Sequence, residues 1–547
     1  MIGIKSTWIK RSNASTVREA VSILSGVSAD ELLHPKDMAP EEIKNITAAS
    51  ETVKQAIEIG NDIYIFGDYD ADGITATAIL FLMLSKQFGV NPHVRLPKRM
   101  SEGYGLSEAA VMEMEPGLLI TVDNGIAAMD AIELAKERGM DVVILDHHQP
   151  LADGSLPCAD VVVDMYAQGQ TEGFRDFCGA GLALKLAQTL VQDKPLLAKM
   201  TALAAIGTVC DAVPLVGPNR VIVKEGIKAI NTGKITKGLK SLLGVCGLTT
   251  VDEQSIGFKI GPILNAAGRL MDDGAKYSCG CIAQDSKPVD ALAQKLIDVN
   301  EQRKTFVNEA FDIAMEQVSS DMTAPVLTCV PEKYDGVVGI VAGKIAEKYD
   351  IPTIVFSVSE DDEEAIMKGS GRTGGDVNIK TVLDSLDPAL MAGYGGHSGA
   401  AGVKVEKKQF PAFKAAIKEA LKDYSVTGLE SVEYDLEINE AEIPDVAVEL
   451  EQYAPFGKGN PRPRVLVTGI KPLRDKYSGK NYRTMGHDNE HIRVKGKDFS
   501  VVWFGAAAKY ETLGDPTVID VVGELAINRS PYGDAPQIAA DDIRRGV

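Results

Sequence analysis

Between residues 60 and 165 the sequence alternates short apolar runs with stretches of helical periodicity. The apolar runs are DIYIFG, GLLITVD, DVVILDHH and ADVVVD, and their length and branched residues are typical of buried strands. GITATAILFLML and AAMDAIELAKERG, which lie between them, are typical of helices. Strands that alternate with helices pair in parallel. This region therefore predicts an α/β domain with helices on both faces of a parallel sheet.

Acidic and imidazole side chains follow three of these predicted strands. They are Asp68, Asp70 and Asp72 after the first, Asp123 after the second, and Asp146, His147 and His148 after the third. Ligand sites in parallel sheets lie beyond the carboxyl ends of the strands, so we expect these side chains to converge on one crevice. Asp211 follows an apolar helix, and we expect it to fold back onto the same place.

The spacing D-x-D-x-D-G in GDYDADG also occurs in the first half of an EF-hand loop. An EF-hand needs a glutamate at the twelfth position, where this chain has Ile79, and its loop follows a helix and not a strand. A phosphate-binding loop would need several glycines and a lysine in the turn, which are missing. A catalytic metal site is the remaining interpretation.

The mixture of carboxylates with one or two imidazoles suits Mn²⁺, and Mg²⁺ less tightly. Several carboxylates can bridge two ions about 3.5 to 4 Å apart, a geometry used to hydrolyse phosphoesters. Taken alone, each aspartate is more typical of a turn or a helix cap, and a histidine pair is as often structural as a ligand. The prediction rests on their occurrence at successive strand ends.

The rest of the 547 residues predicts further domains. APVLTCV, VVGIVAGKIAEKYD, IPTIVFSV and GAAGVKV indicate a second α/β region, and RVLVTGI, HIRVKG, FSVVWFG and TVIDVVGEL indicate a small β-barrel. We expect an N-terminal segment at residues 1–50 and a catalytic domain at residues 51–232. A helical connector at residues 233–320, a second α/β domain at residues 321–425 and a barrel at residues 430–547 should follow.

Charge is unevenly distributed in this acidic chain, whose formal net charge is −20. Residues 425–455 hold nine acids and no lysine or arginine, whereas residues 457–510 hold twelve lysines and arginines and four acids. Aromatic residues among these cations, such as Tyr477 and Tyr482, predict a surface that stacks the bases of a single strand. Alternatively the aromatics fill the barrel core, as we expect for Trp503 and Phe504.

The seven cysteines are odd in number and scattered, which is typical of reduced cysteines in a cytoplasmic protein. Cys279 and Cys281 lack the second pair that a structural zinc site needs. We find no signal peptide and no apolar run long enough for a membrane span, so we expect a cytoplasmic location and no membrane contact.

GDYDADG, TVDNGI, LDHH and GTVCDAVPL together resemble the four motifs of the DHH phosphoesterase superfamily. KRMSEGYGLS, GPILNAAGRL, GVVGIVAGKIAEKYDIPTIVF, KGSGR, GYGGHSGAAG and FGKGNPRP resemble segments of its RecJ family in the same order, from about residue 60 to the end. The resemblance implies a DHH domain, a helical connector, a DHH-associated domain and an OB-fold. It implies a 5′-to-3′ exonuclease that degrades single-stranded DNA to mononucleotides in repair or recombination.

The resemblance also implies roles for individual residues. Two ions, Mn²⁺ or Mg²⁺, would be held by Asp70, Asp72, Asp123, His147 and Asp211. Asp68, Asp146 and His148 would be catalytic, and substrate phosphates would be bound by Arg99, Asn265, Arg269, Ser370, Arg372 and His397. The expected partners are the 5′ end of single-stranded DNA and a single-strand-binding protein or helicase, with the chain a monomer.

Three positions depart from the family pattern. Tyr334 and Asp335 replace a Trp-His pair found in many relatives, and Phe66 occupies a position where some DHH enzymes have a metal-binding histidine. Two other hypotheses remain open. One is a DHH phosphodiesterase of short oligonucleotides or cyclic dinucleotides. The other is a non-catalytic RecJ-like scaffold, which the retained carboxylates disfavour because clustered buried charge is costly.

Overall fold

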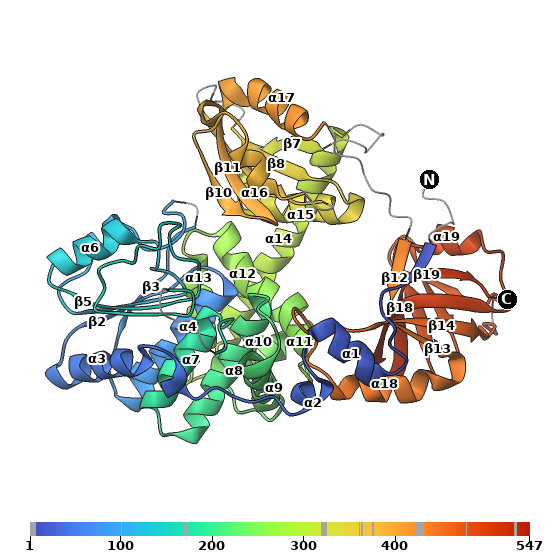
Figure 1. Cartoon of the computed structure of the whole chain (residues 1–547), viewed down its shortest axis with the longest axis horizontal. Coiled ribbons are helices and arrows are strands. Elements are labelled where there is room, and N and C mark those ends of the chain that lie inside the picture. The colour runs from blue at the N-terminus through green and yellow to red at the C-terminus, as the bar shows by residue number, and fades with distance from the viewer. Residues whose placement is uncertain are drawn as a thin grey trace.

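The computed structural model describes residues 7–99, 101–167, 173–318, 325–359, 362, 365–374, 377–422, 431–476, 478–529 and 533–546. The chain forms three folded units (Figure 1). An α/β unit lies at the left, a smaller α/β unit lies above it, and a β-rich unit lies at the right. Within the described residues, no helix combines the length and the apolar character needed to cross a bilayer.

The first unit is built on a five-stranded sheet in which every strand pair is parallel, as predicted. Its order is β3-β2-β4-β5-β6, with bounds His93–Arg95, Ile63–Phe66, Leu118–Val122, Asp141–Asp146 and Val161–Asp164. The apolar runs are strands because they are buried on both faces; every residue of β4 is buried. Its main helices are α3 (Ile46–Ile59), α4 (Ala71–Leu82), α5 (Glu108–Met112), α6 (Met129–Glu137) and α7 (Gly179–Leu190).

A run of helices follows the sheet and shares its hydrophobic core, which includes Leu264 and Leu296. These helices are α8 (Lys194–Cys210), α9 (Gly217–Asn231), α10 (Lys237–Val245), α11 (Glu253–Ser255), the π-helix η3 (Ile256–Ile260), α12 (Gly261–Leu270) and α13 (Gly274–Ile282). The predicted long polar helix is α14 (Asp290–Glu316), which rises from this core to the upper unit (Figure 1).

The upper unit has a five-stranded sheet of order β10-β11-β9-β8-β7. Only the pair β7–β8 is parallel. The strands are Gly393–His397, Ala400–Glu406, Ile366–Arg372, Thr353–Val358 and Val326–Pro331. One face packs on α14 and α15 (Val338–Tyr349), and the other packs on α16 (Ile379–Asp384) and α17 (Phe410–Ala420).

The C-terminal unit is a seven-stranded sheet consistent with the predicted OB-fold, of order β13-β14-β18-β19-β17-β16-β15. The strands are Leu436–Asn439, Arg464–Ile470, Ile519–Asn528, Ala535–Arg545, Ser500–Trp503, His491–Lys495 and Arg483–Met485, with helices α18 (Ile443–Gln452) and α19 (Ala507–Glu511). Trp503 is buried as expected, but Tyr482 is buried too, because it packs against Tyr510 in the core. Phe504 is 64% exposed, so the expectation that it fills the core is wrong. Tyr477 lies outside the described residues.

The amino-terminal segment packs on this C-terminal unit and not only on the catalytic one. Strand β1 (Thr7–Lys10) pairs in parallel with β12 (Ser431–Tyr434), and Arg11 donates two hydrogen bonds to the buried carboxylate of Asp435. Helices α1 (Val17–Ser25) and α2 (Ala29–Leu33) contribute apolar side chains to the core of the C-terminal unit. The two ends of the chain therefore stabilise one fold.

Candidate metal centre and phosphate site

The acidic side chains at the strand ends lie at one edge of the catalytic sheet. Strands β2, β4 and β5 are neighbours and run in parallel, so their carboxyl ends bring Asp68, Asp123 and Asp146 together. All three side chains are almost completely buried. The backbone of Asp123 has φ 65°, a left-handed conformation that an aspartate tolerates better than most residues. The polypeptide turns sharply there and directs the carboxylate into the crevice.

Asp70 and Asp72 are fixed by helix termini. Asp70 caps α4 by accepting hydrogen bonds from the backbone N–H groups of Asp72 and Gly73, at 2.9 and 3.1 Å. Asp72 accepts from Gly179 N and Ala180 N at the start of α7, at 2.6 and 2.9 Å. A Cβ atom at Gly179 would lie 2.6 Å from Cβ of Asp123, so only glycine allows α7 to approach this closely.

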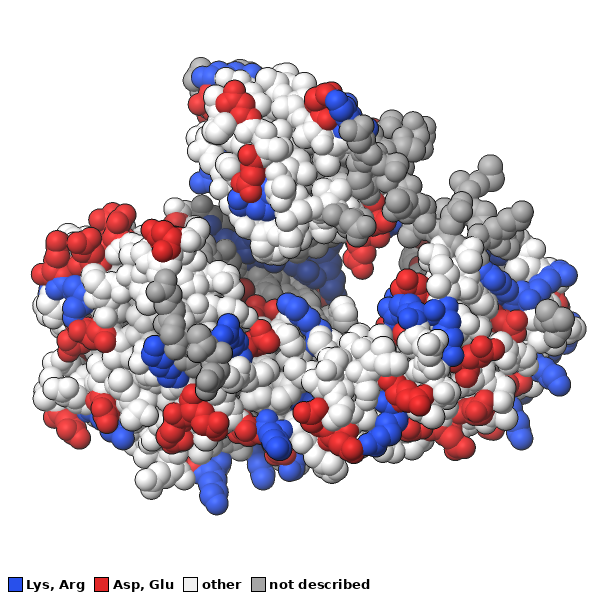
Figure 2. Space-filling view, in the orientation of Figure 1, with Lys and Arg blue, Asp and Glu red and all other residues white. Residues whose placement is uncertain are grey.

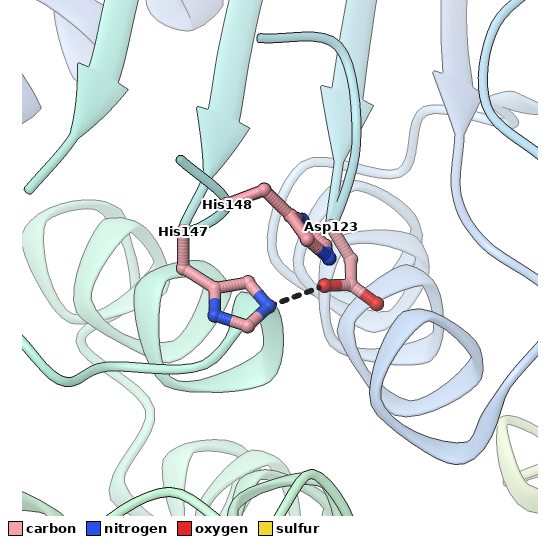
Figure 3. Close-up of side chains that lie close together, drawn as sticks. All are labelled: Asp123, His147 and His148. Carbon is pink, nitrogen blue, oxygen red and sulfur yellow. Dashed lines mark hydrogen bonds and ion pairs between the residues drawn. The ribbon is translucent and has the colours of Figure 1, made fainter. Parts of the chain in front are cut away.

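His147 lies among the carboxylates, and Figure 3 shows its ring directed at Asp123. Its Nε2 is 2.9 Å from Oδ1 of Asp123 and 3.8 Å from Oδ2 of Asp72, and its Nδ1 is 3.8 Å from Oδ2 of Asp211. Asp211 follows α8 and folds back onto the site, as expected. Among the residues that the structure describes, three sets of side chains have ligand atoms within 4.8 Å of one another. They are Asp68, Asp70 and Asp123; Asp72, His147 and Asp211; and Asp123, His147 and His148.

The electrostatics of this cluster favour a bound cation. The pKa of Asp68 and that of Asp211 are raised to about 8, and the pKa of Asp123 is raised well above its usual range. The largest cause is burial, and the second is repulsion by neighbouring carboxylates. Oδ1 of Asp68 is buried and has no hydrogen-bond partner among the described residues. Burial lowers the pKa of His147, which keeps its imidazole neutral and able to coordinate a metal. The donor set therefore fits Mn²⁺ or Mg²⁺.

His148 forms a separate pair with Asp146. Oδ1 of Asp146 accepts a hydrogen bond from the ring Nδ1 of His148 at 2.8 Å, and Oδ2 accepts one from the backbone N–H of Ile126 at 2.9 Å. Burial alone would lower the pKa of His148, but the hydrogen bond and charge of Asp146 raise it to about 9. This pair therefore favours the protonated imidazole of His148. The hydroxyl of Tyr104 lies 3.2 Å from Nε2 of His148 and faces the same crevice.

A cluster of arginines borders the carboxylates. Burial, followed by the like charges of three neighbouring arginines, lowers the pKa of Arg269 to about 10. The neighbours are Arg99, Arg303 and Arg372. Figure 2 shows Lys and Arg side chains gathered in the hollow beneath the upper unit. Such a concentration of guanidinium groups provides a binding site for phosphate oxygens.

The predicted phosphate ligands approach this cluster from both units. Arg372 Nη1 donates to Oγ of Ser370 at 2.8 Å, and a Cβ atom at Gly339 would lie 2.9 Å from Arg372 Nη2. The amino terminus of α15 therefore adjoins this pair and adds the partial positive charge of its free N–H groups. Oδ1 of Asn265, on α12, is buried and has no hydrogen-bond partner among the described residues.

His397, Tyr334 and Asp335 belong to the upper unit, whereas Phe66 is fully buried at the end of β2. His397 is exposed and shares a row of the sheet with Ala400 and Arg372. Tyr334 is buried and donates to Glu309 at 2.8 Å, while Asp335 accepts the hydroxyl of Ser357 at 2.6 Å. These two residues thus stabilise the upper unit internally.

The comparisons with known proteins agree with this architecture. Residues 62–208 match the DHH family, N-terminal domain; residues 324–423 match the DHHA1 domain; and residues 434–542 match the RecJ OB domain. The single-stranded-DNA-specific exonuclease RecJ of Salmonella typhimurium (strain LT2) is 32% identical over 543 residues, which are 93% of this chain and 92% of that protein. The chain belongs to the RecJ family.

RecJ of Escherichia coli (strain K12) is also 32% identical, over 78% of each chain. RecJ of Bacillus subtilis (strain 168) is 32% identical over 94% of this chain, which spans 66% of that longer protein. The crystal structure of RecJ in complex with Mn²⁺ from Thermus thermophilus covers 96% of this chain and 76% of its own, with a TM-score of 0.78 and 28% identity. Another RecJ structure, bound to manganese, is 32% identical with a TM-score of 0.61, over 71% of this chain and 97% of that one.

Three residues at this RecJ site escaped the sequence analysis. Tyr104 lies within KRMSEGYGLS and could have been selected with that motif. Arg303 is one of many charged residues on a polar helix and has no distinguishing local signal. Lys458, in FGKGNPRP of the OB domain, lowers the pKa of Asp211 by its charge, after burial and the carboxylates of Asp70 and Asp72 have raised it. Only the docking of the OB domain places this lysine beside the carboxylates.

Proposed function

We propose that this chain hydrolyses single-stranded DNA from a 5′-phosphorylated end and releases mononucleotides. The observation that carries this proposal is the position of Tyr69. Tyr69 stands between Asp68 and Asp70 in the sequence, and its ring lies 4.9 Å from the guanidinium carbon of Arg99. The carbonyl oxygen of Tyr69 packs against Gly268, the neighbour of Arg269, where an added Cβ atom would lie only 3.0 Å from it. The carboxylate cluster and the arginine cluster therefore adjoin.

The carboxylates and His147 would hold two divalent cations. Asp70, Asp72, Asp123, His147 and Asp211 offer ligand atoms from several directions, and their repulsion is relieved when cations bind. When bound, Mn²⁺ or Mg²⁺ would neutralise negative charge that develops on the phosphate oxygens during hydrolysis. Asp123 belongs to two of the three ligand sets, which supports a bridging role for it.

His148 would act on the scissile phosphate directly. Its imidazolium is held by Asp146 and lies near the carboxylates, so it can donate a hydrogen bond to a phosphate oxygen or a proton to the leaving oxygen. Asp146 is a positioning residue, because all of its hydrogen bonds are directed at the protein. Asp68 would complete the environment of the cations from the end of β2.

The arginine cluster would select the end of the strand. A terminal phosphate carries more negative charge than an internal phosphodiester, so several guanidinium groups favour it. Arg99, Arg269 and Arg372, with Ser370 and Asn265, would bind this phosphate while the next phosphodiester lies at the carboxylates. His397 would contact the strand at the edge of the upper unit. Cleavage one phosphodiester away from the bound end gives mononucleotides.

Residues of one chain supply this whole site, which supports a monomer. A role in DNA repair or recombination, a cytoplasmic location, and a single-strand-binding protein or helicase as partner belong to the same proposal, because single-stranded DNA arises in those processes.

The test uses oligonucleotides labelled at either end, with Mn²⁺ added. A 5′-phosphorylated single strand labelled at its 5′ end should yield labelled mononucleotide from the first time point, whereas the same strand labelled at its 3′ end should shorten progressively. A blunt duplex should resist. Preferential cleavage of dinucleotides or cyclic dinucleotides over long strands would favour the alternative phosphodiesterase, and no hydrolysis with either metal would favour the scaffold.

A further inference from the structure

Phe258 is the most exposed large hydrophobic residue in the described part of the chain. Its side chain is 86% exposed, ahead of Phe504 at 64% and Ile59 at 63%. It lies in the π-helix η3, and π-helical turns occur frequently at functional sites. The exposed phenyl ring is therefore free to contact a ligand through its face.

The helix that carries Phe258 is buried on one side and open on the other. Ile256, Ile260, Gly261, Ile263, Leu264, Ala266, Ala267 and Gly268 are buried. The accessible positions at helical spacing are Gln254, Phe258, Pro262, Asn265 and Arg269. Phe258 therefore shares one stripe with two residues of the phosphate site. About 16 Å of helix axis separates it from Arg269, at 1.5 Å per residue.

The position of Phe258 is fixed relative to the metal ligands. A Cβ atom at Gly261 would lie 2.4 Å from Sγ of Cys210, so this helix packs tightly against the end of α8. Asp211 is the next residue after Cys210. Lys259 Nζ donates to the carbonyl of Cys246 at 2.8 Å, which further holds the turn. The ring is thus presented by a rigid support.

The amino-terminal end of this helical segment meets the OB domain. Glu253, at the start of α11, accepts the backbone N–H of Phe456 at 3.1 Å, and Arg462 lies 3.9 Å from the same carboxylate. The helical segment that carries the stripe therefore runs from the arginine cluster to the OB domain. A strand held at Arg269 and continuing toward the basic C-terminal unit would follow this stripe and pass Phe258.

We propose that Phe258 stacks on a base of the bound single strand, a few nucleotides from the terminal phosphate. This inference rests on the proposed function, because it assigns a subsite to the same substrate. Stacking on an aromatic ring is tolerant of sequence, since every base has a π face, and it suits an enzyme that must accept any strand. The ring would hold the strand in line with the carboxylates without touching the reacting atoms.

The test compares binding of oligonucleotides that lack a single base. 5′-phosphorylated strands with one abasic site, moved stepwise from the 5′ end, are titrated by fluorescence anisotropy in EDTA to prevent hydrolysis. For the unaltered protein, affinity should drop at one position by roughly 5- to 150-fold, the range expected for one stacked base. The Phe258→Ala variant should bind the intact strand more weakly than the unaltered protein does, by the same factor. For this variant, an abasic site at that position should reduce affinity no further.

Three further variants distinguish stacking from other effects. Phe258→Trp should keep the position-dependent loss, whereas Phe258→Leu, which is apolar but has no π face, should behave like Phe258→Ala. Ile59→Ala, an exposed apolar residue on α3, is the matched control and should bind like the unaltered protein. The inference is overturned if Phe258→Ala keeps the full abasic profile or if Phe258→Leu restores it. Either result would leave the proposed function intact, whereas that function fails if the unaltered protein does not hydrolyse single strands with Mn²⁺.

Discussion

Arg220 on α9 donates a 2.9 Å hydrogen bond from Nη1 to the backbone carbonyl of Pro455, which follows α18 in the OB domain. Its other donors reach the carbonyls of Leu32, Tyr453 and Ala454, at 2.6, 2.7 and 2.9 Å. The side chain is fully buried. One guanidinium group therefore joins the catalytic unit, the amino-terminal segment and the OB domain, and three of the four carbonyls belong to consecutive residues.

Replacing Arg220 with Ala should destabilise the OB domain. The carbonyls of Tyr453 and Pro455 still accept hydrogen bonds from Nδ2 of Asn460, at 3.0 and 2.9 Å, but those of Leu32 and Ala454 lose this donor. Each buried unsatisfied group costs about 1 to 3 kcal/mol, so a loss above about 2 kcal/mol is expected. The two tryptophans of the chain, Trp8 and Trp503, both lie in this unit, so tryptophan fluorescence during urea unfolding reports on it selectively. Arg18→Ala, which removes an exposed ion pair with Asp30, is the control and should cost no more than about 1 kcal/mol. Equal effects of the two substitutions would contradict the role of Arg220.

Replacing Asp68 with Asn should stabilise the protein when metal is removed by chelation. The folded-state pKa of Asp68, about 8, lies above its unfolded value near 4, so the ionised carboxyl costs folding free energy that grows as pH rises between these values. The variant should therefore melt at a higher temperature than the unaltered protein, and by more at pH 8 than at pH 5. Added Mn²⁺ should raise the melting temperature of the unaltered protein more than that of the variant. A difference in melting temperature that does not change with pH would contradict this account.

Replacing Arg372 with Ala should remove the preference for a terminal phosphate. A hydrogen bond to a charged group contributes about 1.5 to 3 kcal/mol, so affinity for a 5′-phosphorylated strand should fall by roughly 10- to 150-fold. Affinity for a 5′-hydroxyl strand should change little. Lys418→Ala serves as the control, because α17 covers the opposite face of the same sheet. An equal loss of affinity for the 5′-phosphorylated and the 5′-hydroxyl oligonucleotides would show that Arg372 does not bind the terminal phosphate.

Replacing Lys458 with Ala should reduce the salt dependence of binding to single-stranded DNA. The backbone carbonyl of Lys458 accepts Leu215 N at 2.7 Å, which holds this exposed lysine near Asp211. Loss of one phosphate contact lowers the slope of log affinity against log salt by about 0.7 for single strands. Lys54→Ala, an exposed lysine on α3, should leave the slope unchanged. An unchanged slope for Lys458→Ala would place this lysine away from the DNA.

The parallel sheet and its acidic crevice could be predicted because the signals are local. A buried strand followed by a polar turn is visible in a few residues, and the rule that parallel strands share their carboxyl ends then places Asp68, Asp123 and Asp146 together. The same reasoning located the second α/β unit and the long helix α14.

Features that depend on distant parts of the chain could not be predicted. The pairing of β1 with β12 joins segments more than 400 residues apart, as the match of Thr7 with Ser431 shows, and no short-range pattern encodes it. Burial of Tyr482 follows from its contact with Tyr510 in the barrel, which the sequence pattern does not distinguish from an exposed position. A chain cut before residue 425 would expose the apolar faces of α1 and α2, so the OB domain cannot be removed by a C-terminal deletion alone.

The most direct test of the central claim, that the carboxylate cluster binds the metal that hydrolyses single-stranded DNA, uses Asp123→Asn. Mn²⁺ binding is measured by electron paramagnetic resonance, and mononucleotide release from a 5′-phosphorylated single strand is measured on the same samples. The account predicts that the unaltered protein binds Mn²⁺ and releases mononucleotides, and that the variant folds, loses Mn²⁺ binding and releases no nucleotide above background. Undiminished release by the variant would contradict the account.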